Sequence, residues 1–407
     1  MTAEARFDLL DHRHTQDMWE ITREWRRTTP VLRPMEGHVY VSRFEHCWDV
    51  LRDPATFSNA NGMKAVEMPE EERSLGEMDP PRHTHLRRVM RASFTRRSVE
   101  AQRSFTRANA EELLCELRQR PAVDLVAEFT DVLPNLVTLN LMGFPMEDAP
   151  QVVAWARELL HSDWPALNRT ERGEGLHGAF PEFSHYLDSL VESRRRPDAP
   201  DDMITRLARC EVEGETPSAT VLRTLTAQVI LGGISTSTNM LGSLFYRLLR
   251  DPSLHRRLRE HPASIPAALE ESLRVDPPVL FVLRNCTRET EIGGFSIHGG
   301  ERVVVGISSA NRDEAIFEDP ERYRLDRGRP RHLAFAGGTH LCIGAGLARV
   351  VGCETIETFT RLFDVGDVQL APNFHFEGVP VFLEWGPARL DVQFSRPDAA
   401  RSPSAPA

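Results

Sequence analysis

Cys342 lies between a glycine-rich turn and a segment predicted to be helical, in the run Phe335-Ala-Gly-Gly-Thr-His-Leu-Cys-Ile-Gly-Ala-Gly-Leu-Ala-Arg349. Zinc-binding cysteines cluster and disulfide cysteines pair, and Cys342 shows neither pattern. At a helix start, free N–H groups and the helix dipole favour a thiolate, and Gly337 and Gly338 permit a tight turn that brings N–H groups to the sulfur. Such a thiolate suits the axial position of a haem iron, whereas most lone buried cysteines are inert.

A second candidate for chemistry is the run Leu231-Gly-Gly-Ile-Ser-Thr-Ser237 inside a long apolar stretch. A glycine inside a helix costs about 1 kcal/mol relative to alanine, so the pair Gly232-Gly233 indicates a close approach or a local bulge. Thr236 supplies a hydroxyl beside this pair. The alternative is ordinary helix packing, with Thr236 hydrogen-bonded back to a backbone carbonyl.

Charged residues form a third group. Glu271 and Arg274 are three residues apart, so they share a helix face and can form an ion pair. Arginine and protonated histidine can bind carboxylates. The candidates for this role are His83, Arg87, Arg284 and His340. Taken singly, His83 and Arg87 are better explained by a solvated helix face, and Arg284 by a charge at a strand edge.

The spacing Phe335-x-x-Gly338-x-His340-x-Cys342-x-Gly344 matches the haem-binding signature of the cytochrome P450 superfamily without a departure. The chain also resembles this family, in the expected order, at 79–87, 231–237, 271–274 and 320–323. The resemblance implies that Cys342 is the axial thiolate ligand of haem b (iron protoporphyrin IX), a ligand that favours O–O cleavage. It further implies these haem contacts, with the basic residues on the two propionates: His83, Arg87, Arg284, Phe335, His340, Gly344 and Ala348.

The resemblance also implies a network that supports the cysteine loop. Glu271 and Arg274 would correspond to the family's K-helix pair, and Arg322 to the arginine of its meander. The role of these three residues would be structural rather than catalytic. Removing one partner of such a buried network costs about 3–5 kcal/mol.

One position departs from the family pattern. The distal helix of the family reads Ala/Gly-Gly-x-Asp/Glu-Thr-Thr/Ser, which aligns Gly233 with its glycine and Thr236 with the threonine that directs protons to oxygen. Ser235 then stands where the pattern has an acid. Serine can pass on a hydrogen bond but is a poor proton source, and general acids contribute about 10²–10⁴ in rate. We therefore expect proton delivery to depend on a substrate group or an ordered water.

The elements that must position these residues are mainly helical. A helix over 217–250, with Thr216 as its cap and Pro217 in its first turn, is expected to cross the core. A last helix at 345–363 would enclose the haem together with it. The other expectations are a hairpin within 36–58, a long loop at 59–78, helices across 79–142, 147–215 and up to 273, short strands with Gly-Gly turns at 279–305, and a meander at 318–331.

Composition narrows the function further. The 407 residues carry a net charge of -11, which argues against nucleic-acid binding. The six cysteines are scattered, as in a reducing cytoplasm, and no apolar run reaches about 18 residues, so no membrane anchor is expected. The fold class is mainly α with a small β-rich part. We expect a monomer with one domain over 1–394 and a disordered tail at 395–407.

The activity that the resemblance implies is a monooxygenase reaction with O2. One oxygen atom enters an organic substrate and the other leaves as water, with electrons from NAD(P)H through a separate reductase and ferredoxin. A basic cluster could dock an acidic ferredoxin, although a solvated basic face explains it equally well: Arg87, Arg88, Arg91, Arg96 and Arg97.

The substrate is expected to be a small to medium hydrophobic metabolite of bacterial secondary metabolism. Candidate pocket residues, each also explained as ordinary core, are Met63, Met68, Ile234, Leu280, Phe281, Val381 and Phe382. Two alternatives stay open. The same haem-thiolate fold can catalyse oxidative ring closure, coupling or desaturation, which Ser235 favours, or the protein could bind haem and a ligand without turnover.

Overall fold

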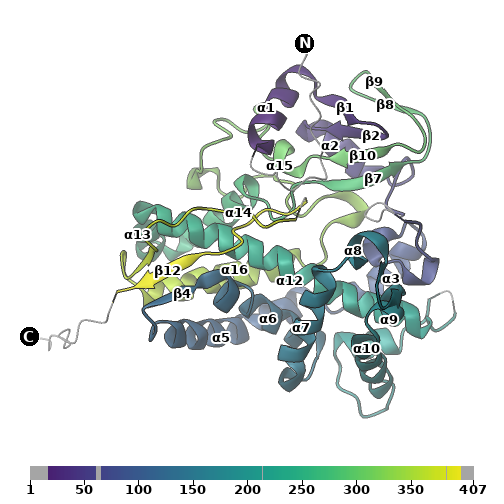
Figure 1. Cartoon of the computed structure of the whole chain (residues 1–407), viewed down its shortest axis with the longest axis horizontal. Coiled ribbons are helices and arrows are strands. Elements are labelled where there is room, and N and C mark those ends of the chain that lie inside the picture. Colours follow the sequence, from purple (N-terminus) through teal and green to yellow (C-terminus); the bar gives the residue numbers. More distant parts are fainter. Residues whose placement is uncertain (1–16, 61–65, 213, 382, 396–407) are drawn as a thin grey trace, which may run out of the picture.

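A 32-residue helix, α12 (Ala219–Arg250), runs through the middle of the molecule (Figure 1). The computed structural model describes residues 17–60, 66–212, 214–381 and 383–395. The cap of α12 is Ser218, whose side chain accepts a hydrogen bond from the N–H of Val221. The prediction of Thr216 as the cap was wrong by two residues, because Pro217 precedes the cap instead of opening the helix.

Helices make up most of the fold, as predicted. The helix α12 packs on α6, α16 packs on α5 and α14, and α10 packs on α12. The remaining helices are α1 (Met18–Thr28), α2 (Phe44–Arg52), α3 (Arg82–Arg91), α4 (Arg96–Glu100), α5 (Gln102–Leu117), α6 (Leu133–Met142), α7 (Ala149–Leu160), α8 (Trp164–Leu167), α9 (Gly175–Ala179), α10 (Pro181–Ser193), α11 (Met203–Ala208), α13 (Pro252–Glu260), α14 (Ile265–Val275), α15 (Ile307–Ala310) and α16 (Ala345–Leu362).

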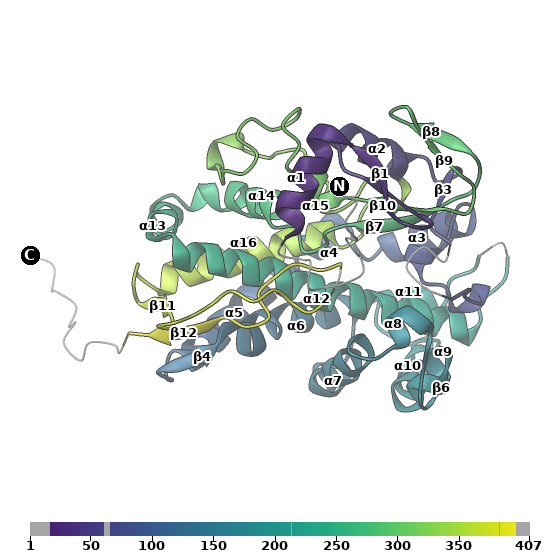
Figure 2. The ribbon, with the colours of Figure 1, turned by 45° about the horizontal axis from the view of Figure 1, so that its top comes forward.

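The β-rich part lies at one side of the helices, together with α1, α2 and α15 (Figures 1 and 2). Its five-stranded sheet has the order β1-β2-β10-β7-β3, in which only the β2–β10 pair is parallel. A second sheet has the order β11-β12-β4, and β5–β6 and β8–β9 are separate hairpins. The bounds are β1 (Val31–Met35), β2 (His38–Val41), β3 (Phe57–Ser58), β4 (Ala122–Asp124), β5 (Arg169–Thr170), β6 (Gly173–Glu174), β7 (Val282–Cys286), β8 (Thr290–Ile292), β9 (Phe295–Ile297), β10 (Arg302–Val305), β11 (Val368–Leu370) and β12 (Asp391–Phe394).

The predicted hairpin within 36–58 was placed too late in the chain. The hairpin is β1–β2, and the segment 44–52 is the helix α2. The residues that α2 buries follow helical spacing, which the alternating pattern before them concealed: Phe44, Cys47, Val50 and Leu51. The predicted strands within 279–305 are confirmed, and the turn between β8 and β9 has positive φ at both Gly293 and Gly294.

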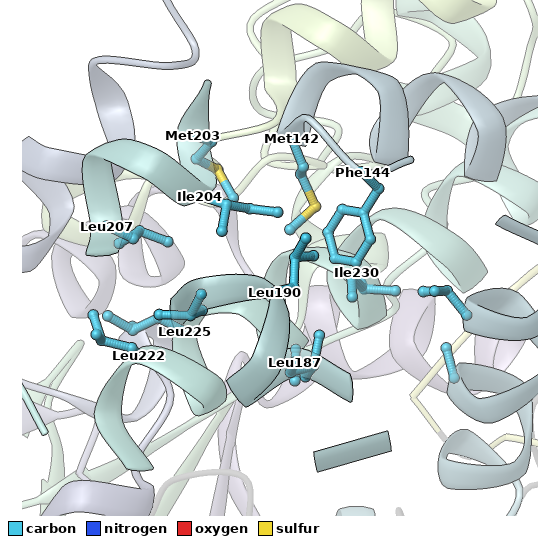
Figure 3. Close-up of a cluster of buried hydrophobic side chains, with 14 of the residues drawn as sticks. Met142, Phe144, Leu187, Leu190, Met203, Ile204, Leu207, Leu222, Leu225 and Ile230 are labelled. Carbon is cyan, nitrogen blue, oxygen red and sulfur yellow. The ribbon is translucent and has the colours of Figure 1, made fainter. Parts of the chain in front are cut away.

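A large apolar cluster fixes α12 against the neighbouring helices. Figure 3 shows side chains from α10, α11 and the N-terminal half of α12 meeting Met142 and Phe144. Leu222 and Leu225 of α12 are fully buried there. This packing sets the rotation of α12 about its own axis, and with it the direction of each side chain in the run 231–237.

No membrane-spanning helix is found in the described segments, because none of their helices is both long and apolar enough. Of the predicted tail at 395–407, Ser395 is ordered, with its backbone nitrogen 2.8 Å from the oxygen of Asp367, and 396–407 lie outside the described residues. The single domain over 1–394 stays a prediction.

Candidate functional site

A cavity of about 390 Å³ lies between α12 and α16. Its lining comes from α3, α12, β7, the cysteine loop and α16, segments far apart in sequence. The candidates that it brings together are His83, Arg87, Gly233, Thr236, Arg284, Phe335, His340, Cys342, Gly344 and Ala348. One cavity therefore collects the basic residues, the thiol and the distal threonine that the sequence singled out.

The glycines of the cysteine loop allow it to pack on α2. Gly338 has φ +63°, and a Cβ there would lie 2.3 Å from the backbone oxygen of Leu51. A Cβ on Gly337 would lie 2.4 Å from the Trp48 ring. The loop closes with a hydrogen bond of 3.0 Å from the N–H of Cys342 to the oxygen of Phe335. The turn thus holds the loop in place.

The N–H groups that bond to the sulfur of Cys342 are those of Gly344 and Ala345, at the start of α16. The predicted donors at the start of a helix are therefore present, and the turn at Gly337 and Gly338 contributes no N–H group of its own to the sulfur. Burial raises the pKa of Cys342, and these N–H groups, together with Arg87 and Arg349, oppose burial only in part. Cys342 is enclosed by the protein but open to the cavity, and a thiol with such donors can release its proton to a metal there, because metal binding requires the thiolate.

The side chains of four basic residues line the same cavity, and they have few hydrogen-bond partners: His83, Arg87, Arg284 and His340. Both ring nitrogens of His83 and Nε2 of His340 have no hydrogen-bond partner among the described residues, and the two rings lie 4.2 Å apart. Arg284 is 4% exposed, and its Nη1 donates to the oxygen of Leu283 at 2.8 Å. Arg87 donates to the oxygen of Leu341.

This crowding of basic groups penalises positive charge. Burial, reinforced by Arg87, lowers the pKa of His83 to about 4. Burial also lowers the pKa of Arg284 to about 10, which Asp79 opposes. For His340, burial and the neighbouring basic groups lower the pKa to about 3. Buried basic groups without partners are costly, so the site fits a ligand that brings carboxylates, as haem does through its propionates.

In α12, Gly233 allows a close approach to α6, whereas Gly232 does not lie against another element. A Cβ on Gly233 would lie 2.9 Å from Oγ1 of Thr138 in α6, whereas a Cβ on Gly232 would meet nothing within 4 Å. Thr236 lines the cavity, and its Oγ1 donates to the oxygen of Gly232 at 2.7 Å. The back-bonded threonine, the alternative considered from the sequence, is therefore what the structure shows.

Ser235 has a partner that the sequence did not reveal. Its Oγ donates to Oε1 of Glu384 at 2.7 Å, and Nδ2 of Asn239 donates to Oε2 of the same carboxyl at 2.8 Å. Ser235 does not line the cavity. The one available signal was a single acid in the run Val379-Pro-Val-Phe-Leu-Glu-Trp-Gly-Pro387, because an isolated charge in an apolar segment needs a partner.

The network behind the cysteine loop contains a different second arginine. Glu271 and Arg274 are fully buried and bond through two contacts of 2.8 Å, which confirms their pairing. Arg322 contributes only its backbone oxygen, which accepts from Arg274 at 3.1 Å, while its side chain is 78% exposed. The arginine that reaches Glu271 is Arg327, with Nε 3.1 Å from Oε1. The prediction of Arg322 was wrong because the meander turns its side chain outward.

Most predicted substrate contacts do not line the cavity. Leu280 and Phe281 are buried in a cluster with Met18 and Tyr40, and the neighbouring cavity residues are instead Val279 and Val282. Three more candidates are likewise absent from the lining, namely Met68, Ile234 and Val381, and Met63 and Phe382 lie outside the described residues. The lining away from Cys342 includes Asn59, Leu75, Gly76, Gln228 and Val229.

The comparisons with known proteins agree with this geometry. A family model described as "Cytochrome P450" matches residues 8–369. The "Polyketide biosynthesis cytochrome P450 PksS" of Bacillus subtilis (strain 168) is 31% identical over 345 residues, which cover 82% of this chain and 83% of that protein. "Cyclomarin C epoxidase CymV" of Salinispora arenicola (strain CNS-205) is 33% identical over 382 residues, covering 91% and 94%. The structure of a mutant of P450 EryK in complex with erythromycin B superposes with a TM-score of 0.85 at 27% identity, covering 96% and 99%. The chain belongs to the cytochrome P450 family.

Proposed function

We propose that the cavity between α12 and α16 is the active site of a haem-thiolate monooxygenase that acts on a small to medium hydrophobic metabolite. The observation that carries the proposal is the meeting of Cys342 with four sparsely partnered basic side chains in one cavity. Bound haem supplies the activation of O2, from which one atom enters the substrate and the other leaves as water.

The residues of the cavity divide into three roles. The sulfur of Cys342 holds the iron, and the N–H groups of Gly344 and Ala345 stabilise its negative charge. The basic residues bind the two propionates, and the remaining predicted contacts of the cysteine loop and α16 border the porphyrin: Phe335, Gly344 and Ala348. Thr236 lies on the α12 side, where its hydroxyl can take part in proton transfer.

The substrate class follows from the distal lining. Leu75, Val229, Val279 and Val282 provide an apolar surface. Gln228 accepts the N–H of Leu75 at 2.6 Å, so this amide oxygen is already engaged. The names of two relatives, which refer to polyketide biosynthesis and to epoxidation of cyclomarin C, support a secondary metabolite as the substrate.

Oxygen insertion is favoured over coupling or desaturation. The argument for those alternatives was that Ser235 replaces an acid. A carboxyl is nevertheless present at this position, because Glu384 bonds to Ser235. Electrons are proposed to come from NAD(P)H through a reductase and a ferredoxin that binds near Arg91 and Arg96, which are exposed on α3 and α4.

A paired cysteine experiment tests the site. Reduced wild-type protein with carbon monoxide should give the absorbance band of a thiolate-ligated haem. Cys342→Ser should lose that band, whereas Cys353→Ser should keep it, because Cys353 lies in α16 but does not line the cavity. Retention of the band by Cys342→Ser would contradict the proposal. With surrogate ferredoxin and isotopic O2, a product identified from a substrate-binding screen should carry one labelled atom, whereas coupling would leave it unlabelled.

A further inference from the structure

The carboxyl of Glu384 is hydrogen-bonded to Ser235, the residue of α12 at which the family pattern has an acid. Ser235 and Asn239 are four residues apart on α12 and therefore share a face. Each donates to one oxygen of Glu384, at 2.7 and 2.8 Å. The carboxyl thus comes from another element but meets α12 at Ser235.

The chain around Glu384 is built to reach α12. Glu384 forms a β-bridge with Val279, flanked by hydrogen bonds from Leu280 to Leu383 at 2.8 Å and from Trp385 to Pro278 at 3.0 Å. A Cβ on Gly386 would lie 2.6 Å from Oδ1 of Asn239, so only glycine permits this approach. The position of the carboxyl is therefore set by backbone pairing and by close packing.

The surroundings of Glu384 favour its protonated form. Burial raises its pKa, which the hydrogen bonds from Ser235 and Asn239 oppose only in part. Its hydrogen-bond partners on α12, Ser235 and Asn239, are neutral, and the segment 278–280 that pairs with its backbone carries no titratable side chain. Within the described part of the chain, Glu384 forms no ion pair.

The carboxyl also lies beside the cavity. Val279, its bridge partner, and Pro278 both line the cavity, as does Thr236, the residue after Ser235. Glu384 as a whole residue is half-buried, although its carboxyl lies in the desolvated part of the residue. Glu384 is therefore bonded to the residue that precedes the cavity-lining Thr236 on α12.

We propose that Glu384, acting through the hydroxyl of Ser235, is the proton-relay residue of this site and takes the place of the acid that the family pattern carries on the helix. For this step the hydrogen bond between Ser235 and Glu384 reverses, so that the protonated acid donates to Oγ of Ser235 and the Ser235 hydroxyl turns toward a water on the cavity side. The acid then gives its proton to Oγ, while Ser235 releases its own hydroxyl proton to that water. The resulting carboxylate regains a proton from solvent water. This inference rests on the proposed function, and it identifies Glu384 as a positioning residue that acts through Ser235.

The alternative is a purely structural carboxyl that ties the 379–387 segment to α12. Glu384→Gln separates the two roles, because glutamine keeps the shape and can still bond to Ser235 and Asn239 but carries no acidic proton. Glu377→Gln is the matched control, since Glu377 is exposed in the same C-terminal segment. Both variants should retain the carbon monoxide band of the wild type.

The first measurement is the amount of oxygenated product formed per NADPH consumed. We expect this ratio to fall about 10-fold or more in Glu384→Gln, within the range of proton-transfer groups, and to stay unchanged in Glu377→Gln. Ser235→Asp, placed in the Glu384→Gln background, should restore it by returning an acid to the helix. In the wild type the ratio should fall as the pH rises through the pKa of Glu384, and in Glu384→Gln it should not. A Glu384→Gln variant with wild-type coupling would overturn the relay and leave the monooxygenase assignment intact.

The second measurement does not depend on turnover. Infrared difference spectra of wild type against Glu384→Gln should show the C=O stretch of a protonated carboxyl persisting above pH 4.5, and Glu377→Gln should keep this band. Its absence from the wild type would overturn the relay even if the enzyme is active. Conversely, a wild type that has this band but gives no oxygenated product contradicts the proposed function instead.

Discussion

Arg327 reaches the buried carboxylate of Glu271 from the meander, with Nε 3.1 Å from Oε1. Its side chain is 11% exposed and also donates to the backbone oxygens of Glu318 and Asp319 at 2.6 and 2.9 Å. Glu271 thereby joins Arg274, from its own helix, to the segment that leads into the cysteine loop. The carboxylate of Glu271 thus connects α14 to the meander that precedes the cysteine loop.

This contact predicts that two nearby arginines differ sharply in importance. Arg327→Ala should lower the free energy of unfolding by roughly 3 kcal/mol, because it leaves a fully buried carboxylate with fewer partners. Arg322→Ala should change it by less than about 0.5 kcal/mol, since that side chain is exposed and its backbone oxygen remains. Urea unfolding, followed by loss of the haem absorbance, measures both. Equal effects would contradict the assignment of Arg327.

The glycine pair of α12 gives a second contrast. Gly233→Ala should destabilise the protein, because its Cβ would lie 2.9 Å from Oγ1 of Thr138 and 3.0 Å from Cγ2. Gly232→Ala should destabilise the protein less than Gly233→Ala does, since a Cβ at Gly232 would meet no protein atom within 4 Å. In a Thr138→Ala background, Gly233→Ala should cost less than in the wild type. Additive thermal shifts in the double variant would show that the two helices do not meet there.

The pH dependence of stability provides a third prediction, at Glu270. Burial alone would raise the pKa of Glu270, but hydrogen bonds from His332 and Arg349 outweigh it and lower the pKa to about 2. The oxygens of Glu270 lie 2.5 and 3.0 Å from nitrogens of Arg349. Because the folded pKa lies below the unfolded value of 4.5, ionised Glu270 stabilises the fold above about pH 4.5, and this contribution is lost as the pH falls toward 2.

Glu270→Gln should therefore lower the free energy of unfolding by about 2 kcal/mol relative to the wild type at pH 7. The difference should stay constant down to about pH 5 and shrink below pH 4.5. Glu260→Gln, at an exposed position of α13, should match the wild type throughout. Urea unfolding at pH 7, 5, 4 and 3 checks this pattern. A difference that grows with acidification would reverse the sign and exclude the assigned cause.

The spacing of residues in the sequence correctly predicted those parts of the site whose members lie close together in the chain. The Glu271–Arg274 pair is three residues apart, and the cysteine loop is one continuous run, so both followed from sequence. The partners from distant segments did not. Arg327 and Glu384 reach their sites through the turn of the meander and the β-bridge to Val279, which depend on tertiary packing. The substrate contacts were predicted wrongly because they also depend on tertiary packing. A shift of one residue along an extended segment decides whether Val279 or Leu280 faces the cavity.

The basic surface of α3 and α4 gives the last prediction. Arg91 and Arg96 are exposed, and neither is among the residues that line the cavity. If an acidic ferredoxin docks there, complementary charge raises its association rate. The double variant Arg91→Gln/Arg96→Gln should therefore raise the KM for ferredoxin several-fold at low ionic strength, with kcat nearly unchanged. The effect should diminish as salt screens the charges, since the Debye length falls to about 10 Å at 0.1 M.

The control for this surface is Arg256→Gln/Arg257→Gln. These two exposed arginines lie on α13, at the opposite end of the molecule from α3 (Figures 1 and 2). The control removes the same net charge, so a general loss of attraction would raise the KM equally in both double variants. A rise confined to Arg91→Gln/Arg96→Gln would locate the docking surface at α3 and α4. An unchanged KM in that variant would instead identify the cluster as a solvated face.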